Sequence, residues 1–303
     1  AARELIADEQ DALFELVGRS MLDGLPLAIE QVGAYMIRAK SGCSFVSYKE
    51  RYLTRRVRLF SIPGSKFSDD HRRSVETTWV LNLEQLRQTE PEGHILKLLY
   101  TMVCCRAGVP IPVELIEQMI RQLAGAQADA DDNCADRIED WVDFELCSRA
   151  SLLRLHDDGD RARSYSMHRL LQEVVVQHRD RDHDPQTAGQ YFQVAVHAAG
   201  ALAMRWHTSK IWNAVGQGRT QLIGLLPHLS ELSCCKSTNF GSATVTAMWE
   251  ATALGAQVAL YITHEYDTAF QLCGQLAQLR TDDDDVSHMT DCHRLRLLIL
   301  GTV

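Results

Sequence analysis

Side chains that could bind a metal ion or transfer a proton are most concentrated between residues 178 and 184. They are His178, Asp180, Asp182, His183 and Asp184. Histidine and carboxylate groups are common metal ligands, so a metal site is one interpretation of this stretch. His178-Arg179-Asp180 also spells the catalytic triplet of protein kinases, but the asparagine that should follow it and the glycine-rich loop are both absent. A charged, solvated run that ends a helix is the simpler interpretation.

Phosphate-binding loops and catalytic nucleophiles lack their usual context in this chain. A P-loop requires the pattern G-x-x-x-x-G-K-[ST], whose amides surround the phosphates. Residues 64–66 (Gly-Ser-Lys) have the wrong order, and residues 216–218 (Gly-Gln-Gly) lack a third glycine and a preceding strand. The pattern G-x-S-x-G is absent, and neither adjacent cysteine pair, at 104–105 and at 234–235, lies beside a histidine. We therefore expect no catalytic residues in this chain.

The composition excludes several classes of protein. The chain has 303 residues, 46% of them apolar, and a net charge of −9. It can therefore bury substantial cores, but it has no excess of the cations that bind phosphate backbones. The longest apolar run, from Ile95 to Cys105, contains Lys97 and is much shorter than the roughly 18 residues that a membrane-spanning helix needs. We expect neither a nucleic-acid partner nor a membrane partner.

The cysteines indicate the redox environment of the chain, and its first residues indicate whether it is a piece of a longer protein. Nine cysteines, an odd number without a C-x-x-C pair, indicate neither a disulfide framework nor a zinc site. A reducing, cytoplasmic location is therefore expected. The chain opens Ala-Ala-Arg-Glu rather than with methionine, so we expect it to be a piece of a longer protein.

Helical spacing of apolar residues dominates the first part of the chain. It predicts a helix over residues 26–40, with Pro26 in the first turn, where a helix tolerates proline. Further helices are expected over residues 9–21 and from Phe45 onward.

A first domain boundary is expected near residue 60. Residues 61–73 are polar and broken, which is typical of a linker, so a helical subdomain over residues 1–60 would end there. Beyond the linker, apolar residues with helical spacing predict a buried helix from Pro91 to Val103 and another from near Pro112.

The clearest β signal lies between residues 153 and 167. Short alternating runs flank an Asp-Asp-Gly-Asp turn at residues 157–160, which predicts a β-hairpin. The helices before this hairpin and another from His168 onward would together form a winged-helix domain over residues 61–183.

Over residues 184–303 only helices are expected. Two helices, over about 248–262 and 267–279, are joined by residues 264–266, and small residues occur along both. This spacing, with a third helix from about His288, indicates tetratricopeptide-like hairpins. The predicted fold class is therefore mainly α: a helical subdomain, a winged helix with a small β-hairpin, and tetratricopeptide-like α-hairpins.

Four segments, in this order, resemble the NB-ARC family of nucleotide switches, which belong to the STAND class. Residues 24–28, Gly-Leu-Pro-Leu-Ala, are similar to the segment that opens the second helix of the family's helical subdomain. Residues 77–79, Thr-Thr-Trp, with the leucines that follow, resemble the start of its winged helix. Residues 166–175, Ser-Met-His-Arg-Leu-Leu-Gln-Glu-Val-Val, resemble its MHD segment, in the variant found in members with tetratricopeptide repeats. Residues 225–229 resemble the lead-in to those repeats, so the resemblance covers roughly residues 11–279.

The resemblance implies a nucleotide site made by two distant segments. The loop of Gly24, Leu25 and Pro26 would pack against the adenine of ADP or ATP, because glycine allows close approach and a proline ring suits a base face. His168 would donate an imidazole N–H to the β-phosphate at a helix start, where free amides favour an anion. Alternatively, the proline merely starts a helix and His168 is a core or capping histidine. Arginine replaces the family's usual aspartate at Arg169, so no role is assigned to it.

The function that the resemblance implies is the regulatory portion of a signal-transduction switch. It would close over ADP and couple the nucleotide state to self-assembly, while the helical repeats bind a protein partner. The P-loop and the residues that bind Mg²⁺ would lie upstream of this chain. This chain alone would then be no enzyme, whereas the complete protein would be a candidate slow ATPase.

Two other functions stay open at this point. One is a nucleotide-independent helical scaffold that binds a protein partner through its hairpins. The other is a winged-helix transcription regulator, which would need basic residues on its recognition helix. The corresponding stretch, residues 138–149, instead contains Asp140, Asp143 and Glu145, which argues against DNA binding.

Overall fold

The computed structural model describes residues 7–18, 21–22, 25–38, 43–60, 70–90, 92–125, 152–157, 163–208, 217–234 and 242–276. These residues group into two compact units. As far as they are described, the first unit comprises residues 1–96, 143–153 and 168–178, and the second comprises residues 97–142, 154–167 and 179–303.

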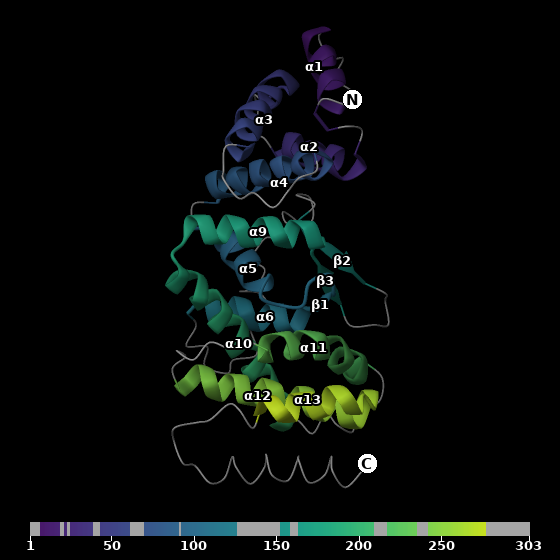
Figure 1. Ribbon diagram of the computed structural model, residues 1–303, viewed down its shortest axis with the longest axis vertical. Helices are drawn as coiled ribbons and strands as arrows, with labels where there is room; N and C mark the ends of the chain where they lie inside the picture. The colour runs from purple at the N-terminus through teal and green to yellow at the C-terminus, as the bar shows by residue number, and fades with distance from the viewer. Residues whose placement is uncertain are drawn as a thin grey trace. The chain divides into compact units, whose positions relative to one another are not determined.

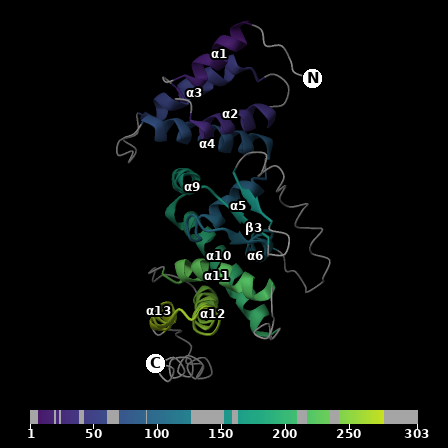
Figure 2. The ribbon, with the colours of Figure 1, turned by 90° about the vertical axis from the view of Figure 1, so that its right-hand side faces the viewer.

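Four helices make up most of the first unit. They are α1 (Ala7–Val17), α2 (Pro26–Arg38), α3 (Phe45–Phe60) and α4 (Asp70–Thr89). α1 packs on α3, and α4 packs on both α2 and α3 (Figures 1 and 2). The largest fully buried side chains of these helices are Leu16, Tyr48, Tyr52, Trp79, Leu83 and Leu86.

Local chemistry explains where α2 and α3 begin. Pro26 is the first residue of α2, where its missing N–H has no helical partner to lose, and the amide of Ile29 donates to the carbonyl of Leu25 at 3.0 Å. Before α3, the amide of Ser47 donates to Oγ of Ser44 at 3.1 Å, and the amide of Ser44 donates to Oγ of Ser47 at 3.0 Å. This reciprocal pair satisfies amides that a helix start leaves without an intrahelical partner.

Buried amide side chains join α2 to α4. Nδ2 of Asn82 donates to the side-chain oxygen of Gln31 at 2.8 Å, and both residues are fully buried. Nε2 of Gln85 approaches the main-chain oxygen of Tyr35 at 3.5 Å. Residue numbers rise together along the two helices, so α2 and α4 run parallel at this contact. Because buried polar groups require partners, these pairs restrict the register between the helices.

The second unit contains a small antiparallel sheet. Strand β3 (Ser164–Ser166) pairs with both β1 (Ile111–Pro112) and β2 (Arg154–His156), which gives the order β1-β3-β2. The expected hairpin is therefore confirmed as β2 and β3. β1 lies between helices α5 (His94–Met102) and α6 (Val113–Leu123), and its pairing with β3 was not expected from the sequence.

The rest of the described chain is helical. Its elements are α9 (Arg169–Asp182), α10 (Pro185–Thr208), α11 (Gln217–Ser233), α12 (Ser242–Val258), the π-helical turn η2 (Ala259–Thr263) and α13 (Tyr266–Leu276). In the second unit, α10 packs on α6 and α12, and α12 also packs on α11 and α13 (Figure 1). His264, with φ 59°, ends the α12–η2 segment in the left-handed conformation and turns the chain into α13.

Small residues set the distance between α10 and α12. A Cβ placed on Gly200 would lie 2.8 Å from Cα of Ala247 and 2.9 Å from its carbonyl oxygen. No real Cβ fits at such a separation, so only glycine allows the two helices to approach this closely. The surrounding buried residues are small or aliphatic: Ala195, Val196, Ala199, Ala203, Ala251 and Leu254.

The mainly helical fold class is confirmed, while several expected boundaries differ from the structure. α4 begins at Asp70, inside the stretch 61–73 expected to be a linker. It packs on α2 and α3, so the first helical unit continues past residue 60. The physical reason is that α4 begins with polar residues, which a pattern of apolar residues does not reveal, while its later turns bury Trp79, Leu83 and Leu86. α1 ends at Val17 rather than near residue 21.

Some expectations concern residues that the structure does not describe. The helix expected within residues 138–149 and the third helix from His288 lie outside the described residues. Among the helices that are described, none combines the length and apolar character needed to cross a bilayer.

Candidate functional site

His168 lies exposed at the start of α9, two residues after β3. Its Nδ1 accepts a hydrogen bond from the amide of Leu170 at 3.2 Å, so its side chain caps the helix. Its ring packs against Trp79 of α4, with ring centroids 5.6 Å apart and planes inclined at 42°. Trp79 itself is fully buried. His168 is therefore held from two sides, by the helix start and by an aromatic ring.

The cap also determines which nitrogen of His168 carries the proton. In a neutral imidazole one nitrogen donates and the other accepts, so an accepting Nδ1 places the proton on Nε2. Nε2 forms no hydrogen bond with any residue that the structure describes. His168 can thus donate an N–H to an exogenous acceptor beside a helix N-terminus, whose positive end favours anions. Capping and phosphate binding are compatible roles, because each uses a different nitrogen.

The start of α2 presents the other predicted residues. Pro26 is exposed and Leu25 is half-buried, so an apolar surface is accessible there. The amide of Leu25 donates to the carbonyl of Leu22 at 2.9 Å, which fixes the turn before the helix. Gly24 lies outside the described residues.

The register between α2 and α4 relates Pro26 to Trp79. Because Asn82 bonds to Gln31 across two parallel helices, the residues on α4 and α2 at this level differ in number by 51. Pro26 precedes Gln31 by about one and a half turns, so it is level with Thr77 on α4. Trp79 lies about 3 Å further along the axis of α4. Pro26 is therefore level with the part of α4 that carries Trp79, and the ring of Trp79 contacts His168. Pro26 and His168 are 142 positions apart in the sequence.

The charged run at residues 178–184 has a structural role. α9 continues through it to Asp182, and His178 is buried. The carboxylate of Asp184 accepts the amide of Thr187 at 2.7 Å and caps α10, and this backbone hydrogen bond lowers the pKa of Asp184. Among the described side chains, no group of three histidine, cysteine, aspartate or glutamate residues is arranged to hold a metal ion.

Sequence reasoning did not find two aromatic contacts. The packing of Trp79 on His168 joins residues far apart in the chain, and the resemblance of the Thr-Thr-Trp segment assigned Trp79 no contact. Tyr100, His183 and Tyr191 also gather, with ring centroids 5.2 to 5.6 Å apart. These contacts depend on which elements meet in the fold, and helical periodicity contains no information about that.

Comparisons of the chain with protein-family models, with curated proteins and with solved structures each gave no match. A functional interpretation therefore rests on the geometry described above and on the resemblance of its segments.

Proposed function

We propose that this chain is the regulatory portion of an NB-ARC-type nucleotide switch that acts in the cytoplasm. Gly24, Leu25 and Pro26 would hold the base of ADP, and His168 would donate to a phosphate oxygen. Nucleotide exchange would then release the winged helix and permit self-assembly. The P-loop and Mg²⁺ ligands of such a switch would come from residues upstream.

The state of His168 carries this proposal. Its Nδ1 is used by the helix cap, which leaves an exposed Nε2–H beside a helix N-terminus. This is the donor that a phosphate requires. Two further observations add support. The ring of Pro26 is exposed, and Pro26 is level with the part of α4 that contacts His168, as a single ligand bound by both residues requires.

The sheet and Arg169 are consistent with the same proposal. A three-stranded antiparallel sheet in the order β1-β3-β2, preceded by α5 and with α6 between its first two strands, supports assignment as a winged helix. Arg169 is exposed and lies 3.9 Å from Glu173, one turn further along α9. It faces solvent, so our proposal assigns it no contact in place of the one that an aspartate at this position would make in the family.

Substitutions at His168 separate its two roles. The measurement is the affinity of a fluorescent ADP for the longer protein that joins this chain to its P-loop. Serine is a good helix cap but is too short to replace Nε2, so His168→Ser should keep the stability of α9 and still weaken ADP binding by about tenfold. His168→Ala should lose both, and Pro26→Ala should weaken ADP binding less.

Arg169→Ala is the matched control, because it removes an exposed side chain next to the cap. It should bind ADP as the unchanged protein does. If His168→Ser and Pro26→Ala both leave ADP affinity unchanged, the nucleotide role is wrong, and the scaffold function is the better explanation.

We also propose that the helices after the sheet bind a protein partner. The α12–α13 pair supports this role, because Phe270 of α13 is 60% exposed although the neighbouring Ala269 is fully buried. A large exposed aromatic side chain is typical of contact surfaces. Sedimentation velocity of the chain and of Phe270→Ser tests whether the partner is a second copy, since the substitution should then lower the fraction of larger species.

A further inference from the structure

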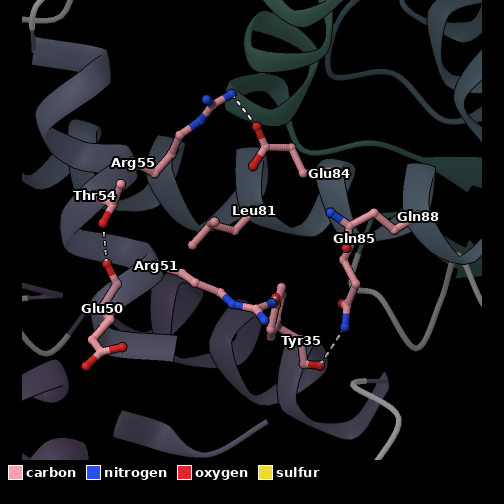
Figure 3. A pocket seen from close by; sticks show the side chains of 9 residues that line it. All are labelled: Tyr35, Glu50, Arg51, Thr54, Arg55, Leu81, Glu84, Gln85 and Gln88. Atoms are coloured by element: carbon pink, nitrogen blue, oxygen red, sulfur yellow. Dashed lines mark hydrogen bonds and ion pairs between the residues drawn. The ribbon is translucent and has the colours of Figure 1, made fainter. Parts of the chain in front are cut away.

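A cavity of about 430 Å³ lies among α2, α3 and α4 (Figure 3). This volume lies within the range of small-molecule sites. The cavity is close to the last turns of α2, whereas Pro26 lies at the first turn, so it is separate from the nucleotide site proposed above. Tyr35, Arg51, Arg55, Leu81, Glu84 and Gln85 are among its lining residues.

Arg51 supplies a positive charge to the cavity. Figure 3 shows its side chain extending from α3 toward Tyr35, whose hydroxyl accepts a hydrogen bond from Nη1 at 2.7 Å. This hydroxyl is the only polar group of a described residue to which Arg51 is bonded, so its charge has no carboxylate partner there. A guanidinium with donors directed into a cavity is well suited to bind a carboxylate.

Gln85 supplies a hydrogen-bond acceptor. The residue is 8% exposed, and its side-chain oxygen is buried without a hydrogen-bond partner among the described residues. Rotating the amide by 180° does not solve this, because the oxygen would then face the main-chain oxygen of Tyr35. An unsatisfied buried acceptor is costly, so a ligand that draws the Gln85 side chain toward the cavity and supplies a donor would relieve this cost.

The charged side chains that line the cavity sum to zero. Arg55 forms an ion pair with Glu84, and Glu50 lies at the same cavity. Two arginines and two glutamates therefore line it, which gives a formal charge of zero. Such a lining disfavours a polyanion such as a nucleotide or an inositol phosphate. It suits a small molecule that carries one charge of each sign.

We propose that this cavity binds a free amino acid, whose carboxylate pairs with Arg51 and whose ammonium group draws the side chain of Gln85 toward the cavity and donates to its oxygen beside Glu84. Tyr35 contacts both protein groups, one through its hydroxyl and one through its main-chain oxygen, so it sets the spacing between them. Leu81 provides an apolar surface for the side chain of the ligand.

The test is calorimetric titration of the 303-residue chain with individual free L-amino acids. At least one of them should bind, and the matching carboxylic acid without the amino group and the matching amine without the carboxylate should each bind about tenfold more weakly or worse. Absence of binding by every amino acid up to about 10 mM would overturn the proposal. Equally tight binding of the plain carboxylic acid would overturn it as well.

Variants at the exposed Arg51 test the assignment without endangering the fold. Arg51→Met should lower affinity for the bound amino acid about tenfold, and Arg51→Lys should recover part of it. Arg87→Met, which removes an exposed arginine of α4 that does not line the cavity, is the matched control and should bind as the unchanged chain does. If Arg51→Met binds as tightly as Arg87→Met, the site is elsewhere. None of these results depends on ADP, so they do not bear on the role of His168.

Discussion

The helical layer of α2, α3 and α4 and the layer of α10, α12 and α13 are packed in opposite ways. The first joins its helices through buried amides, such as Asn82 with Gln31, and it encloses a polar cavity. The second brings its helices together over glycine and alanine, so that Gly200 leaves no room for a Cβ beside Ala247.

The two kinds of packing have different consequences for stability and for ligand binding. Close packing of small residues leaves no space between α10 and α12 at Gly200 and Ala247, so at this contact it contributes stability. A polar layer costs stability wherever a group lacks a partner, and the buried oxygen of Gln85 is such a group. A ligand that supplies a donor to this oxygen would therefore stabilise the first layer.

The largest effect is expected at the close contact of α10 with α12. Gly200→Ala would place a Cβ 2.8 Å from the backbone of Ala247, and the helices must separate to accommodate it. Overpacking of this kind costs about 2 to 3 kcal/mol of unfolding free energy. Urea denaturation of the variant measures it. If Gly200→Ala unfolds at the same urea concentration as the unchanged chain, the close packing of this layer is wrong.

A second effect is expected at the amide pair of the first layer. Asn82→Ala removes the donor to the buried oxygen of Gln31 and should cost about 1 to 2 kcal/mol. Replacing both residues by leucine should recover part of this loss, because the donor and the acceptor of this hydrogen bond are then removed together. Urea denaturation of the single and double variants measures the coupling. Simple additivity of the two substitutions would contradict the pairing.

α11, which packs on α12 of the second layer, contains a buried histidine that makes its unit sensitive to acid. His228 is fully buried, its Nε2 lies 3.0 Å from the carbonyl oxygen of Pro110, and burial lowers its pKa below the usual 6.5. The unfolded chain therefore takes up this proton at a higher pH than the folded chain. The stability from neutral His228 is fully present above about pH 6.5 and is lost as the pH falls toward the folded pKa.

His228→Gln tests this dependence, because glutamine can still donate to the carbonyl of Pro110 but does not titrate. The unfolding free energy of the unchanged chain should fall more steeply than that of the variant between about pH 6.5 and pH 5. Denaturant titrations at several pH values compare the two slopes. Identical slopes would show that His228 does not contribute to the acid sensitivity of its unit.

The smallest effect has the opposite sign and lies at Gly33 of α2. This glycine is exposed within a helix, and nothing lies within 4 Å of a Cβ placed on it. Gly33→Ala should therefore stabilise the chain by about 0.5 to 1 kcal/mol, through helix propensity alone. Together with Gly200→Ala it forms a matched pair, measured by the same denaturation. A loss of stability at Gly33 would show that this face of α2 is covered.

Much of the fold follows from local pattern. Apolar spacing located α2, α5 and the α12–α13 pair, and the Asp-Gly turn located the hairpin of β2 and β3. The end of α1 was misplaced because a helix end depends on local capping, which does not change the apolar pattern. The start of α4 was missed since its first residues are polar.

The candidate site was predictable only in part. The Gly-Leu-Pro and Met-His segments named Pro26 and His168 in advance, and both prove exposed at helix starts. Trp79 was noted only as part of the Thr-Thr-Trp segment, and Arg51 was not singled out as a site residue. Their contacts with His168 and Tyr35 depend on how helices pack, which residue types alone do not specify.

The amino-acid sequence by itself determined which stretches are helical, where the hairpin turns and which residue types could meet a nucleotide, since these depend on neighbours within a few positions. Only the tertiary structure decided that Nδ1 of His168 serves as a cap, that β1 joins the hairpin, and that Arg51 and Gln85 line one cavity. These features arise from side chains that meet across the fold, where burial and register set the energy of each contact.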